Sequence, residues 1–195
     1  MAQKKEYRSA VRSRRLIRQA FLELLHEKPY EKITVTDIVS RADINRSTFY
    51  AHYTDVSGLV DSLLDEITQE ALSLTNNLNI RDLFRNPEPF VSKLLEIGIR
   101  NMDIYKLSRN SDLAVQQIER IKETMVQRAV DTADLPLSFR NSQAFRIHIH
   151  FFIGGIINTY QQWVTGNLDC SAQEIVTQIA TLIKKTEAIF LDFSR

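Results

Sequence analysis

The chain has 195 residues, enough for one sizeable hydrophobic core or two small domains. Only 5 glycines and 4 prolines occur, and this scarcity of turn-forming residues argues against a fold built of strands and tight turns. The single cysteine, Cys170, excludes an internal disulfide and a CxxC metal cluster, and the net charge of +1 indicates no particular partner. We therefore expect an all-α fold.

Charge is distributed unevenly along the chain. Residues 1–60 contain 11 Lys/Arg and 7 Asp/Glu, a net charge of +4, whereas residues 61–195 contain 14 and 17, a net charge of −3. A basic N-terminal part indicates contact with a polyanion, although a solvated, frayed terminus explains the same pattern. Seven basic side chains lie within the first 18 residues: Lys4, Lys5, Arg8, Arg12, Arg14, Arg15 and Arg18.

Targeting and membrane segments are not evident in the sequence. Residues 1–15 are polar and basic, without the apolar region of a signal peptide. The most apolar stretch, 151–157, is far shorter than the roughly 20 residues of a membrane helix. We therefore expect a soluble, cytoplasmic protein without a membrane partner.

The N-terminal elements are predicted from apolar spacing and capping signals. Apolar residues recur at three- and four-residue intervals over 14–26, which predicts a helix with one buried face. A Thr-Val-Thr-Asp capping box then begins a short helix over 34–42. Residues 43–45 form a tight turn, and Asn45 is a suitable N-cap for a second short helix that ends near residue 52.

The rest of the chain continues the helical pattern. Residues 78–89, with Pro87 and Pro89, form its clearest break, and residues 102–112 are a candidate further short helix. About nine helices are predicted in all, in an N-terminal domain over 1–58 and a second helical domain over 59–195. The other predicted helices cover residues 54–76, 89–101, 113–130, 140–165 and 171–190.

Two short helices joined by a three-residue turn are typical of a DNA-binding helix-turn-helix, whose second helix lies in the major groove. On that helix Phe49 is expected to pack inward with Ile44 and Tyr53. Arg46 can donate two hydrogen bonds to a guanine edge. The side chains expected to face outward are Arg46, Ser47, Tyr50 and Ala51. Those suited to phosphates and bases are Ser47, Thr48, Tyr50 and His52.

Residues 33–53, ITVTDIVSRADINRSTFYAHY, resemble the N-terminal DNA-binding domain of the TetR family of regulators. The shared pattern is T-V-x-x-I, then Ala, an aliphatic residue, a T-F-Y triplet and a His-aromatic pair, preceded by LLHEKPYEKITV. Taken without the resemblance, a helical hairpin with solvated polar side chains also explains this stretch. The resemblance implies a three-helix DNA-binding head, a helical body that binds an effector, and a homodimer.

Positions within the motif imply roles for individual residues. Asp43 stands where Gly is usual, so its backbone is expected to tolerate a positive φ. Val56 stands where many members have a Lys that contacts phosphate, and Thr54 or the basic N-terminus is expected to replace that contact. The resemblance implies base contacts for Arg46, Ser47, Tyr50 and Ala51, and phosphate contacts for Thr36, Thr48, Tyr50 and His52.

The predicted helix over 140–165 is apolar on nearly two faces, and Gly154-Gly155 lets another helix approach closely. We expect this helix and the one over 171–190 to form a homodimer interface, as the resemblance also implies. A kink or loose packing at the glycine pair is the alternative. His148 and His150 are two residues apart on a helix and face different directions, so no metal site is expected.

An effector cavity is expected among aromatic and Met side chains, although such residues at helical spacing also form ordinary core. The leading interpretation is a repressor that a small organic effector releases from a palindromic operator. An activator or effector-independent regulator fits the same head, and a protein-binding helical adaptor is a remoter alternative. Without a phosphate loop, nucleophile elbow or metal-ligand spacing, neither an enzyme nor a cofactor is expected. The candidate cavity residues are Phe90, Leu94, Met102, Tyr105, Met125, Phe145 and Phe152.

Overall fold

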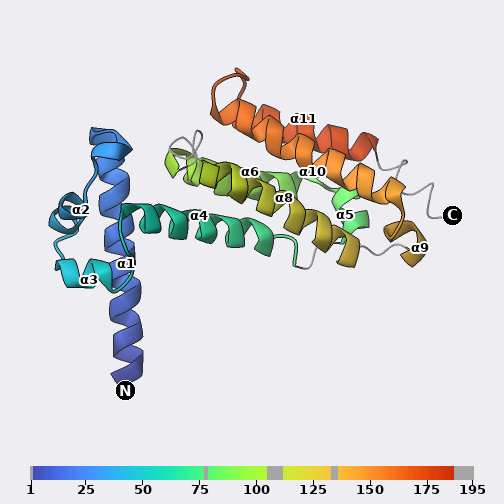
Figure 1. Cartoon of the computed structure of the whole chain (residues 1–195). Coiled ribbons are helices and arrows are strands. Elements are labelled where there is room, and N and C mark those ends of the chain that lie inside the picture. Colours follow the sequence, from blue (N-terminus) through green and yellow to red (C-terminus); the bar gives the residue numbers. More distant parts are fainter. Residues whose placement is uncertain (1, 77–78, 105–111, 133–135, 187–195) are drawn as a thin grey trace. The chain divides into compact units, whose positions relative to one another are not determined.

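The computed structural model describes residues 2–76, 79–104, 112–132 and 136–186 (Figure 1). Every regular element in these ranges is a helix, which confirms the predicted all-α class. None of the described helices combines the length and hydropathy needed to cross a membrane. The backbone contacts divide the chain into an N-terminal unit, Met1–Leu64, and a C-terminal unit, Asp65–Arg195. The division falls inside helix α4, as does the predicted boundary after residue 58.

The N-terminal unit is a small helical domain with an apolar centre. Helix α1 begins at Ala2 and not at residue 14 as predicted. Residues 2–13 contain no Pro or Gly to interrupt a helix, but they also lack the apolar spacing from which a helix is predicted. Its elements are α1 (Ala2–Glu27), a 3-10 turn η1 (Tyr30–Lys32), α2 (Val35–Arg41), α3 (Arg46–Tyr50) and the first half of α4 (Val56–Ser73). Side chains at its centre are Ile17, Phe21, Ile38, Phe49, Leu59 and Leu63.

The start of α2 is held by the predicted capping box. The Thr34 hydroxyl accepts a hydrogen bond from the Asp37 amide at 3.2 Å, and the Asp37 carboxylate accepts one from the Thr34 amide at 2.8 Å. The Lys28 ammonium lies 2.7 Å from the same carboxylate. The hydrogen bond from Lys28, followed by those from Thr34, holds the pKa of Asp37 well below its usual range. These contacts fix where α2 begins.

The turn between α2 and α3 has the backbone that the sequence predicted at its first residue. Asp43 has φ of 50°, in the left-handed region where Gly is favoured and Asp is tolerated. Asn45 lies at the N-cap of α3 with an extended backbone, although in the described structure its side chain makes no capping hydrogen bond. The turn therefore depends on backbone geometry more than on side-chain capping.

The C-terminal unit contains two short helices that the sequence did not predict. Helix α5 lies in the predicted break, where the Asn79 side chain accepts hydrogen bonds from the amides of Arg81 and Asp82 and caps the start of the helix. Helix α9 follows Pro136 directly. Helices this short display no apolar period, which explains why they were missed. After the second half of α4, the described elements of the unit are α5 (Ile80–Arg85), α6 (Glu88–Arg100), α8 (Asp112–Thr132), α9 (Leu137–Arg140), α10 (Gln143–Val164) and α11 (Ala172–Lys185).

The long helices of this unit pack in pairs, α8 against α10 and α6 against α11 (Figure 1). At one close approach, a Cβ atom on Gly98 of α6 would overlap the phenol ring of Tyr160 on α10, so this position requires Gly. The predicted capping box at Ser171 and Glu174 is present at the start of α11. The main core contains Phe84, Val91, Leu95, Val126, Phe145, Ile149, Ile175 and Ile179.

Candidate nucleic-acid interface

Helices α2 and α3 form a compact pair that also contacts α1 (Figure 1). Phe49 of α3 is fully buried, and its ring lies 5.6 Å from that of Tyr53, which is also buried. Ile44 is half-buried beside them in sequence. Because Phe49 anchors one side of this five-residue helix, the opposite side is turned to solvent. The predicted inward face of α3 is confirmed.

The opposite face of α3 presents the side chains that the sequence analysis placed there. Tyr50 is 54% exposed although it is a large aromatic residue, and its ring meets that of Phe49 edge-on at 5.7 Å. A rigid, exposed phenol beside a buried anchor is suited to contact a partner. Thr48 is half-buried, at the edge of this face. The exposed members are Arg46, Ser47, Tyr50 and Ala51.

Two of the candidate residues meet across the turn. A guanidinium nitrogen of Arg46, at the start of α3, donates a hydrogen bond to the hydroxyl of Thr36 on α2. Both side chains are exposed. The contact brings a candidate base-contacting group next to a candidate phosphate-contacting group, and it restricts the guanidinium to the solvent side of the helix pair.

A second arginine, Arg41 of α2, has a different role. Its guanidinium lies 2.7 Å from the Glu27 carboxylate and 3.5 Å from that of Glu23, both on α1. The hydrogen bond from Arg41 lowers the pKa of Glu27. Arg41 therefore ties α2 to α1.

His52, a predicted phosphate contact, lies in a setting that the sequence analysis missed. Its Nε2 atom is 2.6 Å from the hydroxyl of Ser13 on α1, and the Ser13 oxygen is 3.0 Å from the carbonyls of Ser9 and Ala10. Ser13 is buried, and the His52 ring is half-buried. The signal was present in the sequence, because Ser13 precedes Ile17 by four residues and so extends the buried stripe of α1.

Acid is expected to destabilise the N-terminal unit through His52. Burial, followed by the charge of Arg14, lowers the pKa of His52 below its ordinary value of 6.5. The unfolded chain then binds a proton here more readily, so stability falls as pH drops through 6.5 and levels off below the lowered pKa. Denaturant unfolding at pH 7.5 and 5.5 should show a smaller acid-induced loss for His52→Gln than for the wild type. The exposed His150, changed to Gln, is the control, and an equal loss in all three proteins would contradict the assignment.

The remaining candidate phosphate contacts lie around the start of α4 and along α1. The Asp55 carboxylate accepts a hydrogen bond from the Gly58 amide at 2.8 Å and caps α4, while Thr54 beside it is exposed. Val56 is half-buried as the first residue of the helix. The side chains of Lys4, Lys5 and Arg8 lie outside the described residues, whereas those of Arg12, Arg14 and Arg15 are exposed.

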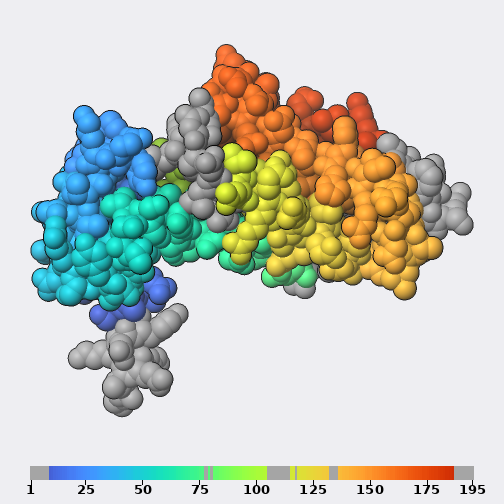
Figure 2. Space-filling view, in the orientation of Figure 1, coloured from blue at the N-terminus to red at the C-terminus, as the bar shows by residue number. Residues whose placement is uncertain are grey.

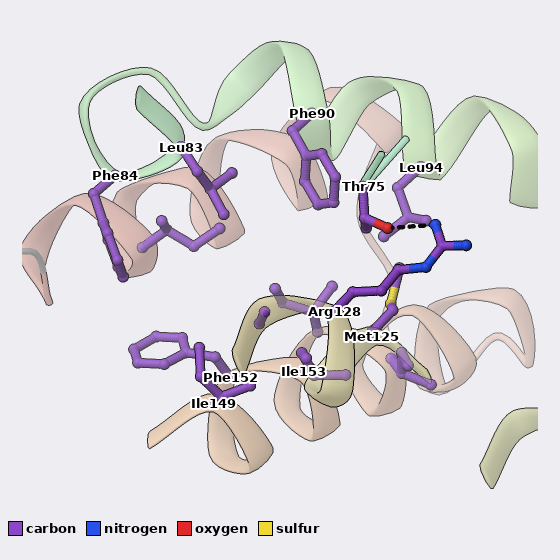
Figure 3. A pocket seen from close by; sticks show the side chains of 14 residues that line it. Thr75, Leu83, Phe84, Phe90, Leu94, Met125, Arg128, Ile149, Phe152 and Ile153 are labelled. Atoms are coloured by element: carbon purple, nitrogen blue, oxygen red, sulfur yellow. Dashed lines mark hydrogen bonds between the residues drawn. The ribbon is translucent and has the colours of Figure 1, made fainter. Parts of the chain in front are cut away.

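The C-terminal unit contains an apolar cavity of about 100 Å³ (Figure 3). Four predicted residues line it: Phe90, Leu94, Met125 and Phe152. Phe145 does not, because it is fully buried in the core with its ring 5.4 Å from that of Phe139. Met102 is half-buried and lines neither this cavity nor the neighbouring one of about 70 Å³. Tyr105 lies outside the described residues.

Helix α10 has a further apolar surface that is open to solvent. Ile147 is 64% exposed and Phe151 is 74% exposed, and Gly155 continues the same four-residue spacing. A Cβ atom at Gly154 or Gly155 would meet nothing within 4 Å, so neither glycine is needed for packing within the described chain. In the view of Figure 2, α8 (yellow) and α10 (orange) lie at the surface of the C-terminal unit. His148 is half-buried and His150 exposed, in agreement with their predicted divergence.

Comparison with known proteins shows what the N-terminal unit is similar to. Residues 17–63 match the sequence profile described as bacterial regulatory proteins, tetR family. A 66-residue segment, 33% of this chain, is 36% identical to the uncharacterized HTH-type transcriptional regulator YxbF of Bacillus subtilis (strain 168). That segment spans only 17% of the length of YxbF.

Solved structures share the fold over most of both chains. The dihydroxyacetone kinase operon activator DhaS is 18% identical, with a TM-score of 0.66 over 91% of this chain and 97% of its own. A TetR-family regulator from Syntrophomonas wolfei str. Goettingen is 14% identical, with a TM-score of 0.66 over 90% and 95%. A TetR regulator from Streptococcus agalactiae 2603V is 20% identical, with a TM-score of 0.58 over 94% and 99%.

Proposed function

We propose that this chain is a DNA-binding transcription regulator of the TetR family, and that it is a homodimeric repressor released from a palindromic operator by a small organic effector. The observation that carries the proposal is the exposed face of α3, fixed by the buried Phe49 behind it. A five-residue helix with one anchored side offers its other side to a groove without reorganisation. We assign no catalytic role to the chain.

Individual contacts follow from the positions of the side chains. Arg46 begins α3, where a recognition helix places its residues on base edges, and a guanidinium matches guanine O6 and N7. Thr36 lies beside it on α2, where a hydroxyl reaches a phosphate. We assign base contacts to Arg46, Ser47, Tyr50 and Ala51, and phosphate contacts to Thr36, Thr48, Tyr50 and His52.

Dimerisation is supported by a stripe of exposed apolar side chains on α10, formed by Ile147 and Phe151, and by a further one on α11. Ile147, Phe151 and Leu182 are more than 60% exposed, which is unfavourable for large apolar side chains in water. Gly155 leaves open space on α10, where a helix of a second copy can approach closely. A two-fold axis through this face pairs each stripe with its own copy, and two recognition helices then match a symmetric site.

Release by an effector is supported by the cavity in the C-terminal unit. Its wall is almost entirely apolar, as small-molecule sites usually are. An effector shifts the protein to its DNA-free state only if it binds that state more tightly. The same DNA-binding unit serves an activator equally well, and DhaS, which shares the fold, is named an operon activator.

The proposal is tested with the purified full chain. Gel shifts against genomic fragments should yield a bound palindrome, and light scattering should give about twice the chain mass of 22.6 kDa. A reporter fused to that site should be repressed by the chain, whereas activation would select the alternative. A monomer at micromolar concentration, or equal affinity for all duplexes, would overturn the proposal.

A further inference from the structure

We propose that the effector is a small monocarboxylic acid with an apolar body, and that Arg128 of α8 is the group that binds its carboxylate. The inference deepens the proposed function and rests on it, since it names the chemistry of the molecule that enters the cavity.

Among the described residues, the cavity wall is polar at only one place. Twelve of its fourteen lining side chains are apolar, and the two polar ones, Arg128 and Thr75, are joined by a hydrogen bond of 3.0 Å. Figure 3 shows this pair at one side of the cavity and Phe84 at the opposite side. A ligand that fits such a wall has one polar end and an apolar remainder, because a second charged group buried among apolar side chains would lose its hydration without compensation.

The positive charge of Arg128 favours a ligand that carries a negatively charged group. A guanidinium only donates hydrogen bonds and is always protonated, so it favours an acceptor and disfavours an amine. Its Nη1 atom now donates to three neutral oxygens: the Leu72 carbonyl, the Thr75 hydroxyl and, at 2.7 Å, the Asn76 side chain. A carboxylate forms stronger, charge-assisted hydrogen bonds with a guanidinium than neutral oxygens do. A bound acid can therefore displace some of these contacts.

The size of the cavity limits the apolar body. About 100 Å³ is space for a single ring or a short alkyl chain. The rings of Phe84 and Phe152 meet edge-on at 6.4 Å on this wall and can pack against such a body. The neighbouring cavity of about 70 Å³ shares Leu94 and Met125 with the first. Met side chains adapt readily, so a slightly larger body can gain room there.

The position of Arg128 also links the ligand to α4. That helix ends at Ser73, and the Leu72 carbonyl belongs to its last turn, where a cation is stabilising. An acid that draws the guanidinium into the cavity weakens this contact. Arg128 therefore acts both on the ligand and on the end of the helix whose other half belongs to the N-terminal unit.

Calorimetry on the full chain without DNA tests the inference, with 3-phenylpropanoate as the probe and 3-phenylpropanol and 3-phenylpropylamine as its matched neutral and cationic forms. We expect the acid to bind at least about tenfold more tightly than the alcohol, and the amine most weakly. Arg128→Gln should reduce the affinity for the acid to that for the alcohol. Arg120→Gln, an exposed position on the same helix, should leave both unchanged. Filling the cavity with Ile153→Trp should abolish both.

If Arg128→Gln does not fold, the three probes on the wild type decide the sign of the charge, and Arg128→Lys tests the need for a planar guanidinium. Equal binding of the acid and the alcohol, or no binding of the acid at millimolar concentration, would overturn the inference. Gel shifts of the unliganded chain are measured separately. DNA binding without acid binding therefore contradicts only the inference, whereas acid binding without DNA binding contradicts only the proposed function.

Discussion

Changing Phe151 to Asp should convert the protein to monomers and weaken operator binding by about 10² to 10⁴-fold, the gain that linking two binding modules typically provides. Phe151 is 74% exposed, and a two-fold interface would bury it once in each copy. Each buried Phe contributes about 1.5–3 kcal/mol, so both copies together stabilise the dimer strongly. The substitution also places two carboxylates in an apolar contact, where their desolvation and mutual repulsion oppose association.

Leu137→Asp is the matched control for this result. Leu137 is 65% exposed, close to the value for Phe151, but it lies on α9 and outside the stripe of α10. Light scattering should show a dimer for Leu137→Asp and a monomer for Phe151→Asp, while circular dichroism shows the same helix content for both. If Phe151→Asp is still a dimer, the interface lies on another surface of the protein.

The second large effect is expected at Arg46. Arg46→Ala should weaken operator binding by about 1–3 kcal/mol, roughly 5- to 150-fold, because two hydrogen bonds to a guanine edge are lost. Binding to random duplex should change much less, since a base contact adds little where the base is wrong. Arg46→Lys keeps the charge but not the planar pair of donors, so it should bind random duplex like the wild type and regain only part of the operator affinity.

Affinities for the operator and for random duplex, each at several salt concentrations, decide the role of Arg46. Each phosphate contact steepens the fall of log K with log salt by about 0.9, whereas a base contact leaves that slope nearly unchanged. Arg41→Ala is a poor control because Arg41 ties α2 to α1. Arg85→Ala, at an exposed position of α5 in the C-terminal unit, is suitable. Equal losses on both duplexes with a shallower slope would make Arg46 a phosphate contact.

The helix-turn-helix could be predicted from sequence because its determinants are local. The capping box joins Thr34 to Asp37 only three residues away, and the turn is marked by Asp43 at its left-handed position. The Ser13–His52 contact could not be predicted with equal ease, since its partners are 39 residues apart. Such pairs depend on how helices cross, which apolar periodicity does not specify.

The residues that line the cavity could also be predicted only in part, because some of their contacts are made by residues far apart in the sequence. Phe90 and Phe152 line it as predicted, because large apolar residues on the inner helix faces surround any space left there. Phe145 has the same chemistry but is buried against Phe139, and spacing alone does not distinguish the two situations. Arg128 was missed because a cation on a polar helix resembles a solvated residue. Its oxygen partners lie more than fifty residues earlier in the chain.

The boundary between the two units lies within one uninterrupted helix, α4. Residues inserted at this boundary therefore change the rotation of one half of the helix relative to the other half. Each residue of an α-helix advances the backbone by about 100° around the axis. One alanine inserted between Leu64 and Asp65 therefore rotates the residues of α4 before the insertion by that angle around the helix axis, relative to the residues of α4 after it. Seven inserted alanines bring the angle back to within about 20° while lengthening the helix by roughly 10 Å. Comparing the two insertions separates the dependence of operator choice on helical phase from its dependence on distance.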